Sequence, residues 1–191
     1  MADHIRVYVF FDGGHIRDGL HKIGVPWSQV DLSQVAKVAL KWVGSSWREL
    51  PMKVSRVYIY DAVPDDADPS QHDVETWLTR NGQQRDAHVR RGHLAGDRRG
   101  GQRIRQKAVD VQLAVDALML ASNGVFDMAL LVTGDADFVP VAEAVRDKGP
   151  LVAVCSFGSS LSDALREVAD RVGYLPDDPA AWQGWELPPS G

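Results

Sequence analysis

The chain has 191 residues, 45% of them hydrophobic, and this length and composition predict one globular domain with a substantial core. Its formal net charge is −5, so overall charge gives no indication of nucleic-acid binding, and any such surface has to be local. The single cysteine, Cys155, excludes an internal disulfide, and no apolar run approaches the roughly 18 residues of a membrane span, so we expect a soluble protein in the reducing cytoplasm.

Four apolar runs rich in β-branched residues predict strands at residues 5–11, 54–60, 128–132 and 151–155. Most of them alternate little between apolar and polar residues, which is typical of strands covered on both faces. Cys155 lies in the fourth run, where we expect a small buried side chain.

Helical patterns lie between these runs. Asp31 and Gln34 form a capping-box pattern before an apolar stripe that ends at Val43. A second stripe, residues 138–145, is closed by Lys148-Gly149-Pro150, and a third opens at Ser160-x-x-Asp163. Strands that alternate with helices predict an α/β fold with a mainly parallel central sheet.

Aspartates follow two of the predicted strands. Asp12 ends the first, and Asp135 and Asp137 follow the third after Thr133-Gly134. Ligands of open parallel sheets bind beyond the carboxyl ends of the strands, so these carboxylates would share one rim if the two strands are neighbours.

A fourth aspartate lies on a predicted helix, residues 107–121. Asp110 projects from its apolar stripe, where an unpaired charge is costly, whereas Asp116 falls on the polar side and should be solvated. Clustered carboxylates repel one another, and a shared proton, a basic side chain or a divalent metal can offset that repulsion. Mg²⁺ favours oxygen ligands and retains waters, so it would suit a few aspartates around a wet site.

Simpler interpretations of each aspartate remain open. Asp137 could cap a helix, Asp12 could be a turn residue, and Asp110 could pair with an arginine at the edge of the core.

One segment has the opposite charge to the rest of the chain. Residues 80–107 carry a local charge of +7, which leaves −12 for the remainder. Residues 92–101 within it predict a flexible loop. Its best candidates for contact with the phosphates of a nucleic acid are Arg98, Arg99, Arg103 and Arg105. The alternative is an ordinary solvated run of charge.

Four stretches in a fixed order resemble the NYN domain family of PIN-like ribonucleases. They are VYVFFDGGHI (7–16), RQKAVDVQLAVDAL (105–118), FDMALLVTGDADFVPVAEAVRDKG (126–149) and LSDALREVADRVGYL (161–175). The resemblance implies a Rossmann-like PIN fold for residues 1–175, with residues 176–191 as a C-terminal tail. It also implies divalent-metal-dependent cleavage of RNA, with Asp12, Asp110, Asp135 and Asp137 as the acidic residues that hold Mg²⁺ or Mn²⁺.

Three further residues have expected roles around that centre. Thr133 would hold an aspartate or a metal-bound water, and Lys107 would contact the phosphate or steer an aspartate. His15 occupies a position where the family commonly has asparagine, so its role is open. Trp182 and Trp185 should pin the tail to the body or dock a partner.

Three other functions compete with a nuclease. A non-catalytic RNA-binding relative would keep the fold, and His15 is the one sequence feature that favours it. A Rossmann-like phosphatase is less favoured, because its Asp-x-Asp would follow the first strand, whereas Gly13 and Gly14 follow Asp12. A phospho-receiver domain fits the acidic positions least.

Overall fold

A mainly parallel sheet organises the protein. The computed structural model describes residues 3–44, 46–47, 50–63, 70–92 and 101–187, without the side chains of residue 46 and residues 101–107. The strands are β1 (Ile5–Asp12), β2 (Ser46–Trp47), β3 (Leu50–Ala62), β4 (Ala87–Gly92), β5 (Met128–Val132), β6 (Leu151–Phe157) and β7 (Arg171–Leu175). Within these ranges six strands run parallel in the order β4–β3–β1–β5–β6–β7, and β2 forms a short antiparallel pair with the start of β3. The predicted α/β class is confirmed.

The strand order reverses beside β1. The chain passes from β1 to β3 and β4 on one side, then crosses back to place β5 on the other side. Phe11 is in register with Ile59 of β3 and with Val132 of β5. The switch point of this sheet therefore lies between the carboxyl ends of β1 and β5, which is where α/β folds bind ligands.

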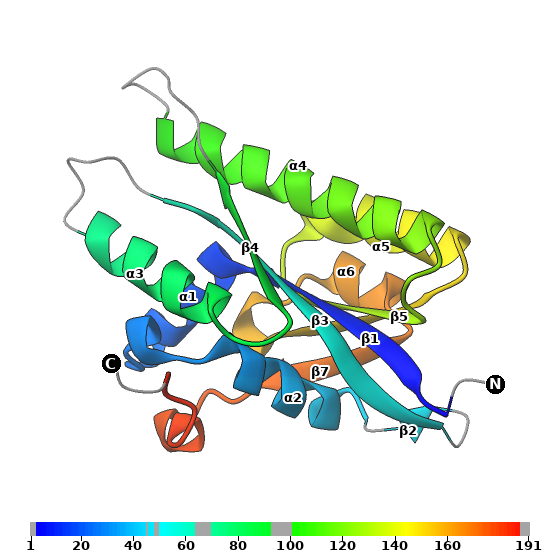
Figure 1. The fold of residues 1–191 in the computed structure, drawn as a ribbon, viewed down its shortest axis with the longest axis horizontal. Coiled ribbons are helices and arrows are strands. Elements are labelled where there is room, and N and C mark those ends of the chain that lie inside the picture. Colours follow the sequence, from blue (N-terminus) through cyan, green and yellow to red (C-terminus); the bar gives the residue numbers. More distant parts are fainter. Residues whose placement is uncertain (1–2, 45, 48–49, 64–69, 93–100, 188–191) are drawn as a thin grey trace.

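Helices cover both faces of the sheet (Figure 1). They are α1 (Gly13–Lys22), α2 (Leu32–Trp42), α3 (Gln71–Gly82), α4 (Gly101–Ser122), α5 (Val139–Asp147) and α6 (Asp163–Val168). The first three pack on one face against Val7, Val9 and Phe11, and the last three pack on the other against Phe10. Alternate β1 residues thus supply two separate cores, as the period-2 geometry of a strand requires. None of the helices in the described ranges is long and apolar enough to cross a membrane.

The start of α2 corrects one detail of the predicted capping box. The Asp31 carboxylate accepts hydrogen bonds from the backbone N–H groups of Ser33 and Gln34, as a helix cap does. The backbone N–H of Asp31 donates to the Trp185 carbonyl at 2.7 Å, so the C-terminal segment takes the place expected for the Gln34 side chain.

The sequence missed three of the described strands, β2, β4 and β7, of which β2 has two residues and β4 is polar. Ala87–Gly92 forms β4, in which His88, Arg90 and Arg91 break the apolar pattern. The third predicted helix is shorter than expected, because α6 is capped by Ser162, not Ser160, and the chain then enters β7.

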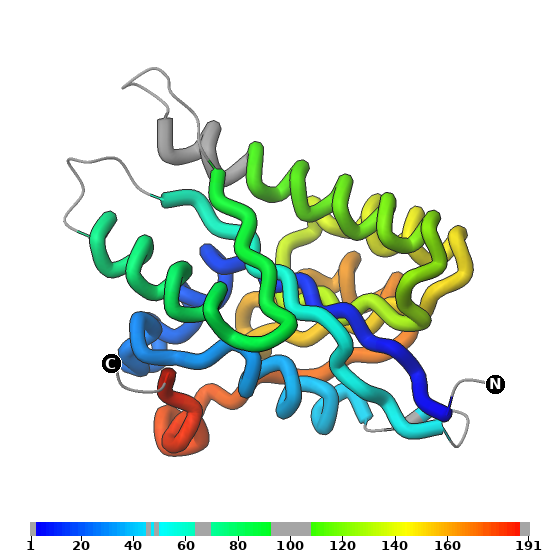
Figure 2. The backbone as a smooth tube through the Cα atoms, viewed as in Figure 1, coloured from blue at the N-terminus to red at the C-terminus, as the bar shows by residue number. Residues whose placement is uncertain are grey.

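The C-terminal segment packs on the face that carries α2. A short 3₁₀ helix, η4 (Pro179–Trp182), buries Trp182 beside Phe157, and Trp185 packs against Trp42. Glu186 bridges to Val30, next to the 3₁₀ helix η1 (Trp27–Gln29), and Figure 2 shows this red segment beside the blue α1–α2 region. The tryptophans pin the described part of the tail to the body, as expected.

Candidate active site

Asp12 lies at the centre of the candidate site. It ends β1 and caps α1, because its carboxylate Oδ1 accepts a hydrogen bond from the His15 backbone N–H at 3.0 Å. The next position requires glycine, since a side chain on Gly13 would approach the Asp61 side chain to 2.7 Å. The strand therefore turns into the helix tightly and leaves Asp12 at the switch point.

Thr133 joins the ends of the two central strands. Its hydroxyl donates to Asp12 Oδ2 at 3.0 Å, and both residues are buried, with Asp12 8% exposed. Burial is the main reason that the pKa of Asp12 lies above its usual range, and the Asp135 charge adds to the increase. Two hydrogen bonds and poor solvation thus hold one carboxylate in a fixed orientation.

Asp135 and Asp137 lie in the loop after β5. Asp135 caps the 3₁₀ helix η2 (Ala136–Phe138) by accepting from the Asp137 backbone N–H at 2.9 Å, and both side chains are exposed. Phe138, not Asp137, occupies the cap position of α5. The helix-cap explanation of Asp137 is therefore wrong.

The loop that carries these aspartates is held against the next loop. The Gly134 carbonyl accepts from the Ser162 N–H at 2.9 Å, and a side chain at Gly134 would clash with the carbonyl oxygen of Ser160. Ser160 ends the 3₁₀ helix η3 (Gly158–Ser160), which follows β6. Glycine is required at position 134 to bring the aspartates to this edge of the sheet.

His15 lies beside the carboxylates as a neutral side chain. Its Nε2 shares a hydrogen bond of 3.0 Å with the Ser156 hydroxyl of β6. Burial lowers the pKa of His15 to about 4, against the opposing effect of the Asp18 charge. The imidazole is therefore uncharged near pH 7, and it can orient a polar group without neutralising a carboxylate.

A pocket of about 280 Å³ opens at this place. Its lining includes His15, Asp18 and Lys22 of α1, together with Asp135 and Ser160 from the loops after β5 and β6. Sequence reasoning missed Asp18, Lys22 and Ser160. Asp18 and Lys22 follow His15 by three and seven residues, so the helical period was the signal that would have found them.

A buried ion pair between Arg17 of α1 and Asp61 of β3 lies next to Gly13, the residue after Asp12. Asp61 is fully buried at the end of β3 and accepts from Arg17 Nε at 2.7 Å and from Arg17 Nη2 at 2.9 Å. Asp61 also follows a predicted strand, so the rule that selected Asp12 would have selected it. Its bidentate pairing with Arg17 gives it a structural partner already.

Asp110 and the basic candidates lie on or before α4. Asp110 is half-buried between the buried residues Val109 and Leu113. Arg103, Arg105 and Lys107 lie in the first turns of α4, but their side chains are outside the described residues, as are Arg98 and Arg99 entirely. Their predicted roles stay predictions.

Asp116 is not the solvated residue that the sequence predicted. Its carboxylate accepts from the Tyr60 hydroxyl at 2.9 Å and from Arg90 Nε at 3.0 Å. This network ties α4 to β3 and β4, and it assigns Arg90 to a structural contact.

The residues at the switch point fit a hydrated magnesium ion. Asp12 and Asp135 offer oxygen atoms, and Mg²⁺ in proteins commonly uses one or two carboxylates while it keeps several waters. Among the described residues no three His, Cys, Asp or Glu side chains lie close enough together to hold a metal ion. In the described part of the chain, Asp12 and Asp135 are thus neighbours but do not form a complete set of metal ligands.

The described strands form a Rossmann-like parallel sheet, and acidic residues lie at its switch point. The NYN domain description matches residues 6–176, so the chain belongs to the NYN domain family, whose fold is PIN-like, as the resemblance implied.

One sequence relative and one solved structure extend the comparison. The uncharacterized protein MJ0482 of Methanocaldococcus jannaschii is 41% identical over 64 residues, which are 34% of this chain and 27% of that protein. The crystal structure of VPA0982 from Vibrio parahaemolyticus, a protein of unknown function, has a TM-score of 0.65 at 19% identity and covers 93% of this chain and 97% of its own. The second likeness supports the fold.

Proposed function

We propose that this protein is a ribonuclease that uses Mg²⁺ or Mn²⁺ to hydrolyse RNA phosphodiester bonds. The observation that carries the proposal is the buried Asp12 carboxylate at the switch point, held by Thr133 and close to Asp135. Burying a carboxylate charge away from water destabilises a fold. A cation bound at that edge of the sheet would offset the charge and could also bind a phosphate.

The acidic residues would hold the cation, some directly and others through water. Asp12 and Asp135 are the best placed for it, and Asp137 and Asp110 complete the proposed set. A bound divalent ion supplies activation of water and neutralisation of charge at the phosphate.

The surrounding side chains have separate proposed tasks. Thr133 fixes the orientation of Asp12, and neutral His15, held by Ser156, orients a polar group at the rim. Lys22 lines the same pocket and is a candidate to contact the RNA phosphate. Lys107 at the start of α4 is a second candidate for that contact.

RNA binding by an acidic protein requires local positive charge. The basic residues Arg98, Arg99, Arg103 and Arg105 would supply it by contacting phosphates on either side of the cleaved bond. Such contacts carry little sequence information, so single-stranded or structured RNA is the expected substrate. We place the activity in the cytoplasm, because the single cysteine of the chain, Cys155, cannot form an internal disulfide.

Cleavage of labelled RNA tests the proposal. Purified protein should cleave RNA with Mn²⁺ or Mg²⁺ and not with EDTA, and Asp135→Asn should abolish the cleavage. Asp147→Asn, which changes an exposed aspartate at the end of α5, is the matched control and should cleave as the wild type does. Equal cleavage by all three proteins would reject the assignment.

A second candidate is an RNA-binding NYN protein with little or no catalytic activity. The observation that favours it is the open arrangement of the carboxylates in the described residues, together with His15 at the site. Retained RNA binding without cleavage at any divalent-ion concentration would select this function. Turnover of a simple phosphate ester without RNA cleavage would instead select a phosphatase.

A further inference from the structure

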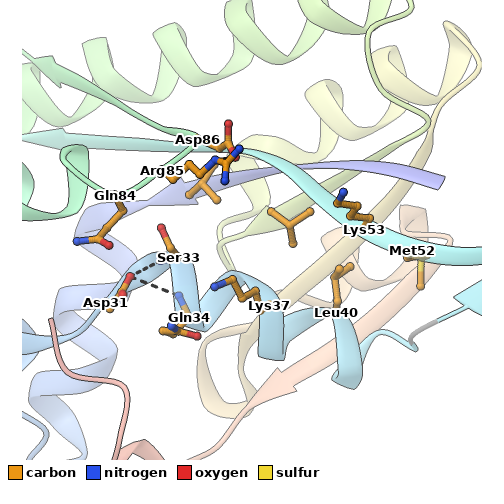
Figure 3. Close-up of a pocket in the computed structure, with 12 residues that line it drawn as sticks. Asp31, Ser33, Gln34, Lys37, Leu40, Met52, Lys53, Gln84, Arg85 and Asp86 are labelled. Carbon is orange, nitrogen blue, oxygen red and sulfur yellow. Dashed lines mark hydrogen bonds and ion pairs between the residues drawn. The ribbon is translucent and has the colours of Figure 1, made fainter. Parts of the chain in front are cut away.

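A second cavity lies away from the candidate active site. It measures about 470 Å³ and is bounded by α2, β3 and the turn between α3 and β4 (Figure 3). Its β3 residues run from Met52 to Val57, and Met52 is in register with Ile5 at the start of β1. Asp12 lies at the other end of that strand, so the two sites occupy opposite ends of the sheet. A cavity of this size suits a small organic molecule.

Positive charge surrounds this cavity. Lys37 of α2 and Lys53 of β3 line it, and Figure 3 shows Arg85 on the wall beside Asp86. Neither lysine ammonium forms an ion pair with any described residue, and the Arg85 side chain is 97% exposed.

The two acidic residues of the lining are engaged elsewhere. Asp31 is buried and caps α2 through two backbone N–H groups. Asp86, whose φ is 67°, accepts from Arg56 Nη1 at 2.7 Å, and its other carboxylate oxygen lies 3.8 Å from Nε of the exposed Arg85. The charge left without a counterion in the cavity is therefore positive, and it favours an anion.

A buried hydroxyl in the wall lacks a partner. The Oγ atom of Ser33 is inaccessible to solvent and forms no hydrogen bond within the described part of the chain. Buried polar atoms are nearly always satisfied, so each exception calls for a cause. Because Ser33 lines the cavity, rotation of its side chain about χ1 would bring this hydroxyl to the surface that an oxygen of a bound ligand can reach.

The remaining wall is apolar. Leu40 of α2 and Met52, Val54 and Val57 of β3 form it, and Figure 3 shows Leu40 and Met52 at the end of the cavity away from Gln84. A ligand that fills the cavity would therefore combine a charged group with an apolar body.

We propose that this cavity binds a small organic anion whose phosphate or carboxylate group lies between Lys37, Lys53 and the Ser33 hydroxyl, and whose apolar body contacts Leu40 and Val57. The site is separate from the proposed nuclease centre and does not depend on it. Charge-assisted hydrogen bonds from the two ammonium groups supply much of the affinity.

Amide chemical shifts measured by NMR in EDTA test the site. The probes are AMP as a phosphate monoester, 2-naphthoate as an aryl carboxylate, and adenosine as the uncharged control for AMP. We expect AMP, 2-naphthoate or both to bind saturably and to shift the amides of Ser33, Gln34, Lys53 and Asp86, whereas adenosine binds at least about tenfold more weakly. Which of the two anions binds more tightly identifies the preferred charged group.

Charge reversal locates the contact. Lys37→Glu and Lys53→Glu should each weaken binding about tenfold or more, whereas Lys41→Glu, one turn further along α2 and outside the cavity, should not. Asp135→Asn should bind the anion as the wild type does, so loss of RNA cleavage and loss of anion binding are separable results. Binding of adenosine as tight as AMP, equal effects of all three lysine changes, no binding of either anion, or shifts confined to His15, Asp18 and Asp135 would overturn the proposal.

Discussion

The charge on Asp12 has an energetic cost in the folded chain. Burial raises its pKa, which means that the folded state favours the protonated form more than the unfolded state does. Such a group contributes stability at low pH and loses that contribution as pH rises through its folded pKa. At neutral pH, well above the ordinary pKa of an aspartate, the burial of Asp12 therefore lowers the stability of the fold.

Asp12→Asn should therefore raise the melting temperature at pH 7 in the presence of EDTA. The amide keeps one oxygen for the His15 N–H and turns its NH₂ toward the Thr133 hydroxyl, which can accept, and the buried charge is gone. Differential scanning calorimetry at pH 7 measures the change, and RNA cleavage by the variant should be lost. A lower melting temperature would show that the charge stabilises the fold.

The pH dependence of stability has the opposite sign for His15, because burial lowers its pKa. Its pKa falls from 6.5 in the unfolded chain to about 4 in the folded protein, so only the unfolded chain takes up the proton between these values. Stability is therefore complete near neutral pH and falls as pH drops toward 4.

His15→Asn should remove this part of the acid sensitivity. Between pH 7 and about pH 4.5, the wild type should lose roughly 2 kcal/mol more unfolding free energy than the variant, because a pKa shift of one unit corresponds to about 1.4 kcal/mol. Urea unfolding at both pH values gives the difference. Parallel losses in the two proteins would mean that the histidine titrates normally.

At the scale of elements, one ion pair locks α1 onto β3. The Arg17 and Asp61 side chains are 18% and 0% exposed, so water cannot take the place of Arg17 at the Asp61 carboxylate. Arg17→Met should leave the buried carboxylate uncompensated and cost about 3–5 kcal/mol of unfolding free energy.

Arg166→Met is the matched control for that change. Its pair with Asp163 lies on the surface of α6, where the two side chains are 46% and 86% exposed. An exposed pair contributes less than about 1 kcal/mol, so urea unfolding should show a small effect. Similar costs for the two variants would contradict the role given to the buried pair.

The segment before α4 carries the prediction for RNA binding. Reversing Arg98 and Arg99 to Glu should weaken binding to RNA of any sequence and reduce the slope of log K against log salt, because fewer counterions are released. Fluorescence anisotropy at several salt concentrations measures both effects. Lys148→Glu at the end of α5 is the control. An unchanged slope in the double variant would mean that the segment is an ordinary solvated run of charge and does not contact RNA.

Elements buried on both faces were the ones that the sequence predicted best. β5 has the bounds that its apolar run predicted, since a continuous run is what a central parallel strand requires. β4 pairs only with β3 among the described strands and tolerates charged residues, so its pattern carried little signal.

The sequence misjudged Asp116 because its partners Tyr60 and Arg90 come from other elements, which helix periodicity cannot reveal.

The sequence likewise predicted some residues of the candidate site and missed others. The sequence indicated Asp12 and Thr133 through their places at strand ends, and the structure joins them by a hydrogen bond. Ser156 escaped notice because its contact with His15 depends on β6 lying next to β5, an arrangement that only the folded sheet provides.

At the scale of the whole molecule, the strand order brings distant segments to one edge. Asp12 and Thr133 are 121 positions apart, yet they meet because β1 and β5 are neighbours beside the switch point. The positively charged cavity lies at the other end of the sheet, so the fold carries two chemically different candidate sites.

The position of a bound divalent cation tests the central claim most directly. We would soak crystals in millimolar Mn²⁺ and locate the ion by its anomalous scattering. The account predicts a peak within coordination distance of Asp12 or Asp135, with Asp110 and Asp137 near enough to act directly or through water. A protein that binds no Mn²⁺ there, or binds it only at unrelated surface carboxylates, would contradict the account.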